Sequence, residues 1–158
     1  MSEVNVVVGM QYGDEGKGKL VDFLAAKADY VVRFQGGNNA GHTVVINGEP
    51  TVLHFIPSGV FNDNICVMGN GVVLDLEELQ KEIDMIETKG VSLKDRFLIS
   101  ENAHLILPED VEGSVTDKIG STGKGIAPAY TNKYAKTGLR AIDIINVARL
   151  HVVADLDF

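Results

Sequence analysis

Short apolar runs alternate with glycine-rich polar stretches along the first part of the chain, and this pattern predicts an α/β fold. Val4 to Val8 is rich in β-branched residues and too brief for a helix, so it predicts a buried strand. Apolar positions between Leu20 and Ala28 recur at helical spacing, and Tyr30 to Phe34 predicts a second strand. The glycine-rich stretch Gly9 to Lys19 joins the first strand to the helix. This order predicts a mainly parallel sheet with a P-loop-like phosphate-binding loop.

A β-hairpin is predicted as an insertion after the second strand. Val44 to Ile46 and Thr51 to Ile56 are apolar runs separated by an Asn-Gly pair, which is a favoured hairpin turn. Glu49 and Pro50 add residues between the two runs, so we expect a looser loop than a two-residue turn. The hairpin is expected to have a structural role.

A helix and further strands are predicted beyond the hairpin. Asp75 to Lys89 carries apolar residues on one face, begins with the capping-box-like pair Asp75 and Glu78, and ends before Gly90. We expect this helix to act as scaffold. We expect His104 to be a packed or surface residue rather than a ligand. Four strands are expected around the helix, over Ile65 to Met68, Val72 to Leu74, Arg96 to Ser100 and His104 to Leu107.

Composition narrows the class of protein. The 158 residues suffice for a single nucleotide-binding α/β domain over residues 1–158, and the net charge of −8 argues against nonspecific binding to nucleic acid or anionic membrane. No apolar run approaches membrane-spanning length, and the start of the chain lacks the layout of a signal peptide, so we expect a cytoplasmic protein. Cys66 lies in an apolar run and is expected to be buried and inert.

The glycine-rich stretch has the chemistry of a phosphate site. Glycines let the backbone approach an anion, and the free N–H groups of the following helix attract it, with Lys17 adding a positive charge. The residue after Lys17 is Gly18, where the usual phosphate loop has a Ser or Thr that holds Mg²⁺. Asp14 and Glu15 are the oxygen donors that a hard cation would find instead. A plain structural turn is the alternative.

Two further polar stretches follow predicted strands or helices. Gln35 to Thr43 contains Asn39 and His42, which could be a turn former and a loop histidine. Ligands of parallel sheets bind at the carboxyl ends of the strands, so we expect Asp14, Lys17, Asn39 and His42 to face one pocket. The third stretch, Asp117 to Tyr130, combines hydroxyls, glycines and two lysines, which fits either a second anion site or a solvated loop.

Together the three stretches resemble those of the adenylosuccinate synthetases. The resemblance rests on the runs QYGDEGKGK from Gln11, NAGHT from Asn39 and GSTGKGI from Gly120, and it extends to about Asp143. It implies a large, mainly parallel sheet and GTP-dependent ligation of IMP to L-aspartate with Mg²⁺, a step in making AMP. Members of the family are mostly homodimers. The chain would then be the N-terminal part of a longer enzyme.

The resemblance also implies roles for individual residues. Asp14 would take the proton from N1 of IMP, His42 would act as an acid that stabilises charge on the leaving GDP, and Lys17 would neutralise the same region. The metal ligands would be Asp14 and the Gly41 carbonyl. GTP would contact Gly13, Asp14, Glu15, Gly16, Lys17, Gly18, Lys19, Gly41, His42 and Thr43. IMP would contact Asp14, Glu15, Gly16, Lys17, Asn39, Ala40, Gly41, His42, Thr122 and Lys136.

Two departures from the family pattern leave alternatives open. Lys136 stands where relatives carry an arginine that reaches the IMP phosphate of the neighbouring subunit, and lysine lacks the two-pronged grip of a guanidinium. The chain also stops at Phe158, before the guanine-reading motif and the aspartate loop of the family. A related enzyme that aminates another purine nucleotide and a noncatalytic nucleotide-binding module are therefore the alternatives to a synthetase.

Overall fold

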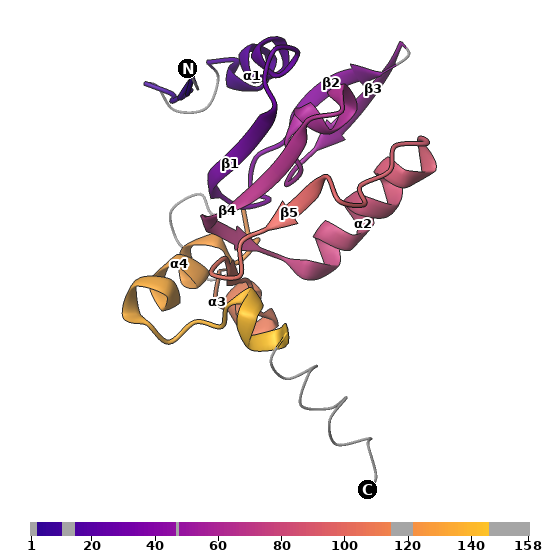
Figure 1. Cartoon of the computed structure of the whole chain (residues 1–158). Helices are drawn as coiled ribbons and strands as arrows, with labels where there is room; N and C mark the ends of the chain where they lie inside the picture. The colour runs from indigo at the N-terminus through magenta and orange to yellow at the C-terminus, as the bar shows by residue number, and fades with distance from the viewer. Residues whose placement is uncertain (1–2, 11–14, 47, 115–121, 146–158) are drawn as a thin grey trace, which may run out of the picture.

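A parallel β-sheet forms the centre of the molecule. The structure is a computed structural model that describes residues 3–10, 15–46, 48–114 and 122–145. Strand β4 (Ile65–Leu74) pairs in parallel with β1 (Tyr30–Gly36) on one side and β5 (Phe97–Ile99) on the other (Figure 1). Strand β6 (His104–Leu105) also pairs in parallel with the end of β4. The predicted α/β fold with a mainly parallel sheet is confirmed.

The predicted hairpin is present, but its turn is tighter than expected. Strand β2 (His42–Ile46) pairs in antiparallel fashion with β3 (Glu49–Leu53), and Ile46 lies opposite Glu49, so only two residues connect the strands. Gly48 has a φ of +84°, a left-handed conformation that a two-residue turn demands. Pro50 is tolerated within β3 because a strand of a two-stranded ribbon has a free edge, where a missing N–H costs no ladder hydrogen bond.

The helices include the two that were predicted, after the glycine-rich stretch and over Asp75 to Lys89, and others that were not predicted. They are α1 (Lys17–Ala25), the 3₁₀ helix η1 (Ser58–Asn62), α2 (Leu76–Thr88), α3 (Pro108–Ser114) and α4 (Ile126–Ala135). The Asp75 carboxylate accepts a hydrogen bond from the Glu78 backbone N–H at 3.1 Å, so the predicted cap of α2 is confirmed. Leu79 and Ile86 of α2 are buried as predicted, whereas Leu76 is 44% exposed. Helices α3 and α4 pack together beyond the end of β4 (Figure 1).

Two predictions about strands were wrong. Val4 to Val8 forms no strand: Val4, Val6 and Val8 are 83%, 70% and 60% exposed, and no strand in the described part of the chain pairs with them. An apolar run becomes a strand only where a neighbour accepts its backbone hydrogen bonds. The second wrong prediction concerns Ile65 to Met68 and Val72 to Leu74, which form one continuous strand, β4, rather than two. Its Gly71 lies against the Phe34 backbone, where β1 has a bulge, so the glycine permits close strand contact instead of ending the strand.

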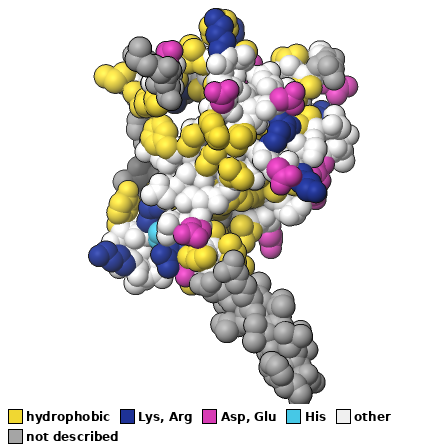
Figure 2. Space-filling view, viewed as in Figure 1, with side chains coloured by type: hydrophobic (Ala, Val, Ile, Leu, Met, Phe, Trp, Pro, Cys, Tyr) yellow, Lys and Arg dark blue, Asp and Glu magenta, His cyan; other side chains and the backbone are white. Residues whose placement is uncertain are grey.

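The core fills one face of the sheet and the space beneath the hairpin. Its fully buried side chains include Met68 of β4, Ile86 of α2 and Phe55 of the segment between β3 and η1. On the opposite side of β1, Tyr30, Val32 and Phe34 stay 60%, 52% and 47% exposed. Apolar side chains also gather on the face shown in Figure 2.

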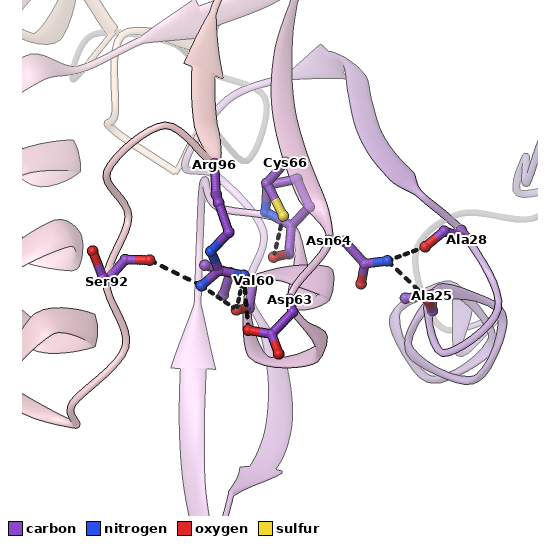
Figure 3. A network of polar contacts seen from close by, with 9 residues as sticks. Ala25, Ala28, Val60, Asp63, Asn64, Cys66, Ser92 and Arg96 are labelled. Carbon is purple, nitrogen blue, oxygen red and sulfur yellow. Dashed lines mark hydrogen bonds and ion pairs between the residues drawn. The ribbon is translucent and has the colours of Figure 1, made fainter.

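Polar contacts tie the base of β4 to the end of α1 (Figure 3). The Asn64 side-chain amide donates to the backbone carbonyls of Ala25, at 3.0 Å, and Ala28. Arg96 forms an ion pair of 3.4 Å with Asp63 and donates to the Val60 carbonyl of η1. The C-terminal end of α1 is thereby fixed to the sheet, which sets where its N-terminal end lies.

Candidate functional site

A cleft of about 800 Å³ runs between the start of α1, strand β1 and the start of β2. This volume lies in the range of small-molecule sites. Most of the polar and glycine residues of its lining come from two of the stretches singled out in the sequence: Gly9, Gly16, Lys17, Gly18 and Lys19 from the first, and Gln35, Gly36, Asn39, Gly41, His42 and Thr43 from the second, which also contributes Ala40. Arg33 and Ser58 line the cleft from outside these two stretches. The expectation that the first two stretches meet in one pocket is therefore confirmed for Lys17, Asn39 and His42.

The start of α1 presents a positive end to the cleft. Gly16 precedes the helix with a φ of +74°, and no side chain caps the first turn, so backbone N–H groups there are available to an anion. Lys17 lies in that turn, and its Nζ is 2.6 Å from Glu15 Oε2. This ion pair sits over Gly9, where an added Cβ would lie 2.6 Å from Lys17 Nζ. A phosphate entering the cleft competes with Glu15 for the lysine.

The departure from the usual phosphate loop has a steric cause. A Cβ built on Gly18 would lie 2.8 Å from His42 Cβ and 3.2 Å from His42 Cγ. These distances are shorter than the 3.5 to 4.0 Å at which carbon atoms normally pack. His42 therefore occupies the space that a Ser or Thr at position 18 would need. A Ser or Thr hydroxyl at position 18, as in the usual phosphate loop, and the His42 side chain cannot both be accommodated here.

His42 is neutral at physiological pH. Burial lowers the pKa of its imidazole, the nearby Arg33 lowers it further, and Glu82 and Asp22 oppose the shift. The ordinary histidine value is already below 7, so a lowered pKa leaves the ring uncharged with one N–H donor. The neutral ring has one N–H that can donate a hydrogen bond to a negatively charged group, and its other nitrogen is an acceptor.

The third stretch reaches the loop after β1. Lys124 Nζ donates to the Asn38 backbone carbonyl at 2.9 Å, and Asn38 itself is buried. The Tyr130 hydroxyl accepts from the Gly36 N–H at 2.7 Å and donates to the Gly71 carbonyl at 2.8 Å. These contacts place the start of α4 against the carboxyl end of β1. The part of this stretch from Asp117 to Ser121 lies outside the described residues.

Several predicted site residues lie elsewhere or cannot be placed. Gly13 and Asp14 lie outside the described residues. Thr122 is exposed and is not part of the cleft lining, and Lys136 is exposed at the C-terminal end of α4 with a φ of +62°. Glu15 contributes the ion pair to Lys17.

Two functional candidates were not predicted from the sequence. Arg33 in β1 donates to backbone carbonyls of the loop after β1 and of the segment after β3. Glu82 in α2 is only 6% exposed and accepts from three backbone N–H groups of the same segment. Their only signal in the sequence is a charged residue within an otherwise apolar strand or beside an apolar helix face.

Other candidates have structural explanations. Cys66 is fully buried, burial raises the pKa of its thiol to about 12, and its Sγ lies 3.6 Å from the Pro57 carbonyl, so the predicted inert core cysteine is confirmed. His104 Nδ1 lies 3.4 Å from Lys133 Nζ.

Among residues 3–10, 15–46, 48–114 and 122–145 no group of three His, Cys, Asp or Glu side chains could hold a metal ion. Within those same ranges, no helix is both long enough and apolar enough to cross a membrane.

Comparison with known proteins agrees with this geometry. The family model described as adenylosuccinate synthetase matches residues 6–155. The adenylosuccinate synthetase of Alteromonas mediterranea is 51% identical over 99% of this chain and 39% of its own length. Adenylosuccinate synthetase 1 of Pseudoalteromonas translucida is 58% identical over 89% of this chain and 34% of its own length. The chain thus spans somewhat over a third of the curated relatives it matches.

Solved structures give the same result. The fully ligated adenylosuccinate synthetase of Plasmodium falciparum has a TM-score of 0.76 and 38% identity, over 85% of this chain and 33% of that one. A succinoaminodeoxyadenylate synthetase of cyanophage S-2L, bound to dGMP and dATP as an energy donor, has a TM-score of 0.70 and 27% identity, over 90% of this chain and 42% of that one. From its sequence, its fold and the lining of its cleft, the chain belongs to the adenylosuccinate synthetase family.

Proposed function

We propose that the complete protein joins IMP to L-aspartate at the expense of GTP, and that this chain forms its phosphate-binding and catalytic part as a single α/β domain. The observation that carries the proposal is the meeting of Lys17, Asn39 and His42 in one cleft at the start of α1. A helix N-terminus, a lysine and a neutral histidine donor together suit the transfer of a phosphoryl group from one oxygen to another.

The reaction needs activation of a poor leaving group. Asp14 takes the proton from N1 of IMP, which makes oxygen 6 nucleophilic. Oxygen 6 then attacks the γ-phosphorus of GTP, and the bond from that phosphorus to GDP breaks. The amino group of aspartate next attacks carbon 6 and displaces phosphate, with loss of a proton from the amine. Positioning and electrostatic stabilisation are the main contributions of the protein to such a phosphoryl transfer.

Lys17 and His42 act on the charge that develops during this transfer. The Lys17 ammonium leaves Glu15, 2.6 Å away, for the phosphate oxygens, and the neutral His42 donates its N–H toward the leaving GDP. Contacts to GTP come from Gly13 to Lys19 and from Gly41 to Thr43, and the contacts to IMP include Asn39 and Thr122. The half-buried position of His42 strengthens its hydrogen bond because little water competes for the ring.

Mg²⁺ would be held by Asp14 and the Gly41 carbonyl. Mg²⁺ takes one or two protein ligands and completes its shell with phosphate oxygens and water, so one carboxylate and one carbonyl would be a sufficient contribution from the protein. When bound, the ion would neutralise the charge of the transferring phosphates. Gly41 is exposed and lines the cleft, which places it where a cation beside the phosphates would bind.

The proposed base is tested with the full-length protein. Asp14→Asn should lower the rate of adenylosuccinate formation from GTP, IMP and aspartate by about 10²- to 10⁴-fold, the usual effect of a general base. Asp29→Asn is the matched control, because Asp29 is exposed at the opposite end of β1. If both variants and the unmodified protein form adenylosuccinate at similar rates, Asp14 is not the base. If the unmodified protein forms none, the proposed activity is wrong.

A second candidate changes the substrate but not the reaction class. Lys136 lacks the guanidinium fork expected at the nucleotide phosphate, and the cyanophage relative is bound to dGMP rather than IMP. Competition between IMP and other purine monophosphates for the full-length protein separates the two candidates. Binding of IMP alone supports the synthetase, and preferential binding of another monophosphate supports the second candidate. We further propose that the full-length protein is a homodimer in which Lys136 reaches the IMP of the partner subunit.

A further inference from the structure

A short bent segment, His54 to Ile56, connects the hairpin to η1. Charged side chains hold its N–H groups on one side and its carbonyls on the other. On the side of its N–H groups lies Glu82 of α2. The carboxylate accepts from His54 at 2.9 Å, from Phe55 at 3.0 Å and from Ile56 at 2.8 Å. Glu82 is 6% exposed, so these hydrogen bonds form out of contact with bulk water.

On the side of the carbonyls lies Arg33 of β1. Its Nη1 donates to the carbonyls of His54 and of Phe55, the latter at 3.3 Å. The other donors of the same guanidinium reach the end of β1 and the loop after it: Nε contacts the Gln35 carbonyl at 3.4 Å, and Nη2 contacts the Gly37 carbonyl. One side chain thus joins two backbone segments that lie about twenty residues apart in the sequence.

The segment also supports the loop that carries the ligand-binding residues. A Cβ built on Gly41 would lie 2.8 Å from His54 Cε1, so the loop packs directly onto His54. On its other side the adjacent His42 packs against Gly18 of α1. The loop is therefore held between α1 and His54, and a shift of His54 would displace Gly41 and His42 in the cleft.

We propose that Arg33 and Glu82 are positioning residues of the nucleotide site, which fix the His54 to Ile56 segment from its two sides and thereby hold the Gly37 to His42 loop in its binding geometry. Neither residue is part of the proposed chemistry. The consequence for nucleotide binding rests on the proposed function, whereas the ordering of the loop does not.

Both charges are needed for this arrangement. A carboxylate offers two acceptor oxygens to three N–H donors, whereas the amide of Gln has one oxygen and would turn its own N–H₂ toward a backbone N–H. The planar guanidinium reaches four carbonyls at fixed angles, and the single ammonium of Lys cannot do so. Conservative variants should therefore loosen the segment while filling nearly the same volume.

The test compares Glu82→Gln, Glu82→Asp and Arg33→Lys in the full-length protein, with Glu77→Gln as the control because Glu77 is exposed on the same helix. We expect backbone amides of His54 to Ile56 and of the Gly37 to His42 loop to exchange hydrogen at least about tenfold faster in the first three variants. We also expect the Kd for GTP to rise at least about fivefold, with the smallest change for Glu82→Asp.

The outcomes separate the two proposals. Faster exchange in the segment with unchanged exchange in the loop and unchanged GTP affinity would mean a role in stability alone and would overturn the inference, as would unchanged exchange in the segment. If the unmodified protein binds no GTP, the proposed function fails, and loop exchange alone decides the positioning role. If Glu82→Gln does not fold, Glu82→Asp and Arg33→Lys give the same comparison.

Discussion

Replacing Gly18 by Ser tests the steric argument for the unusual phosphate loop. The new Cβ would lie 2.8 Å from His42 Cβ, which is roughly 1 Å inside normal carbon contact. Both atoms sit on backbone, in the first turn of α1 and at the start of β2, so no side-chain rotation relieves the overlap. Overpacking of this kind costs about 1 to 3 kcal/mol of folding free energy. For a cooperative unit of about 150 to 250 residues, we expect a fall in Tm of about 2 to 12 °C.

The effect on turnover should exceed the effect on stability. His42 would have to move by roughly 1 Å, and a misplacement of that size can lower a rate by about 10²-fold. Thermal unfolding followed by circular dichroism and adenylosuccinate formation by the full-length protein measure the two effects. Gly113→Ser is the control, because a Cβ at Gly113 meets no atom within 4 Å. A Gly18→Ser protein with unchanged Tm and a rate within twofold of normal would refute the steric exclusion of a hydroxyl by His42.

Three further predictions concern single side chains. Tyr130→Phe leaves the Gly36 N–H and the Gly71 carbonyl without the hydroxyl between them, so urea unfolding should show a loss of about 1 to 3 kcal/mol. The pKa of the Cys66 thiol is near 9 in the unfolded chain and about 12 in the folded protein. The free energy of unfolding should therefore fall as the pH rises above 9, by up to about 1.4 kcal/mol per pH unit. Cys66→Ala should remove this dependence. Lys136→Arg should tighten IMP binding measured by calorimetry, and an unchanged Kd would show that this side chain does not meet the phosphate.

Local signals in the sequence were enough to locate most of the elements. The Asp75 cap, the glycine-rich turn before α1 and the position of the hairpin at Asn-Gly each depend on residues a few positions apart, and each was predicted, although the hairpin turn is tighter than expected. The failures came where a partner decides the outcome. Val4 to Val8 has the composition of a strand, but no strand in the described residues lies beside it. The glycines of β4 suggested a break, whereas their reason is the close backbone of Phe34 in β1.

The same distinction applies to the site. Lys17, Asn39 and His42 could be assigned to one pocket because each follows a predicted strand or glycine loop. Arg33 and Glu82 could not be assigned, because their partners are backbone atoms 2 to 28 residues away, and the periodicity of a strand or helix does not indicate these contacts. Buried charges of this kind become visible only when the hydrogen-bond partners of each one are counted in the structure.

The buried charges of Arg33 and Glu82 need an explanation other than stability. A buried carboxylate or guanidinium loses its hydration on folding, and burial does lower the pKa of Arg33 while Glu82 raises it. Apolar residues of similar volume would pack here without that loss, so stability alone does not favour two charges around three peptide groups. Charged side chains fix the direction of the His54 to Ile56 backbone through their hydrogen bonds, whereas apolar side chains would not. Because the loop with Gly41 rests on that backbone, a fixed direction is what the proposed phosphate site requires.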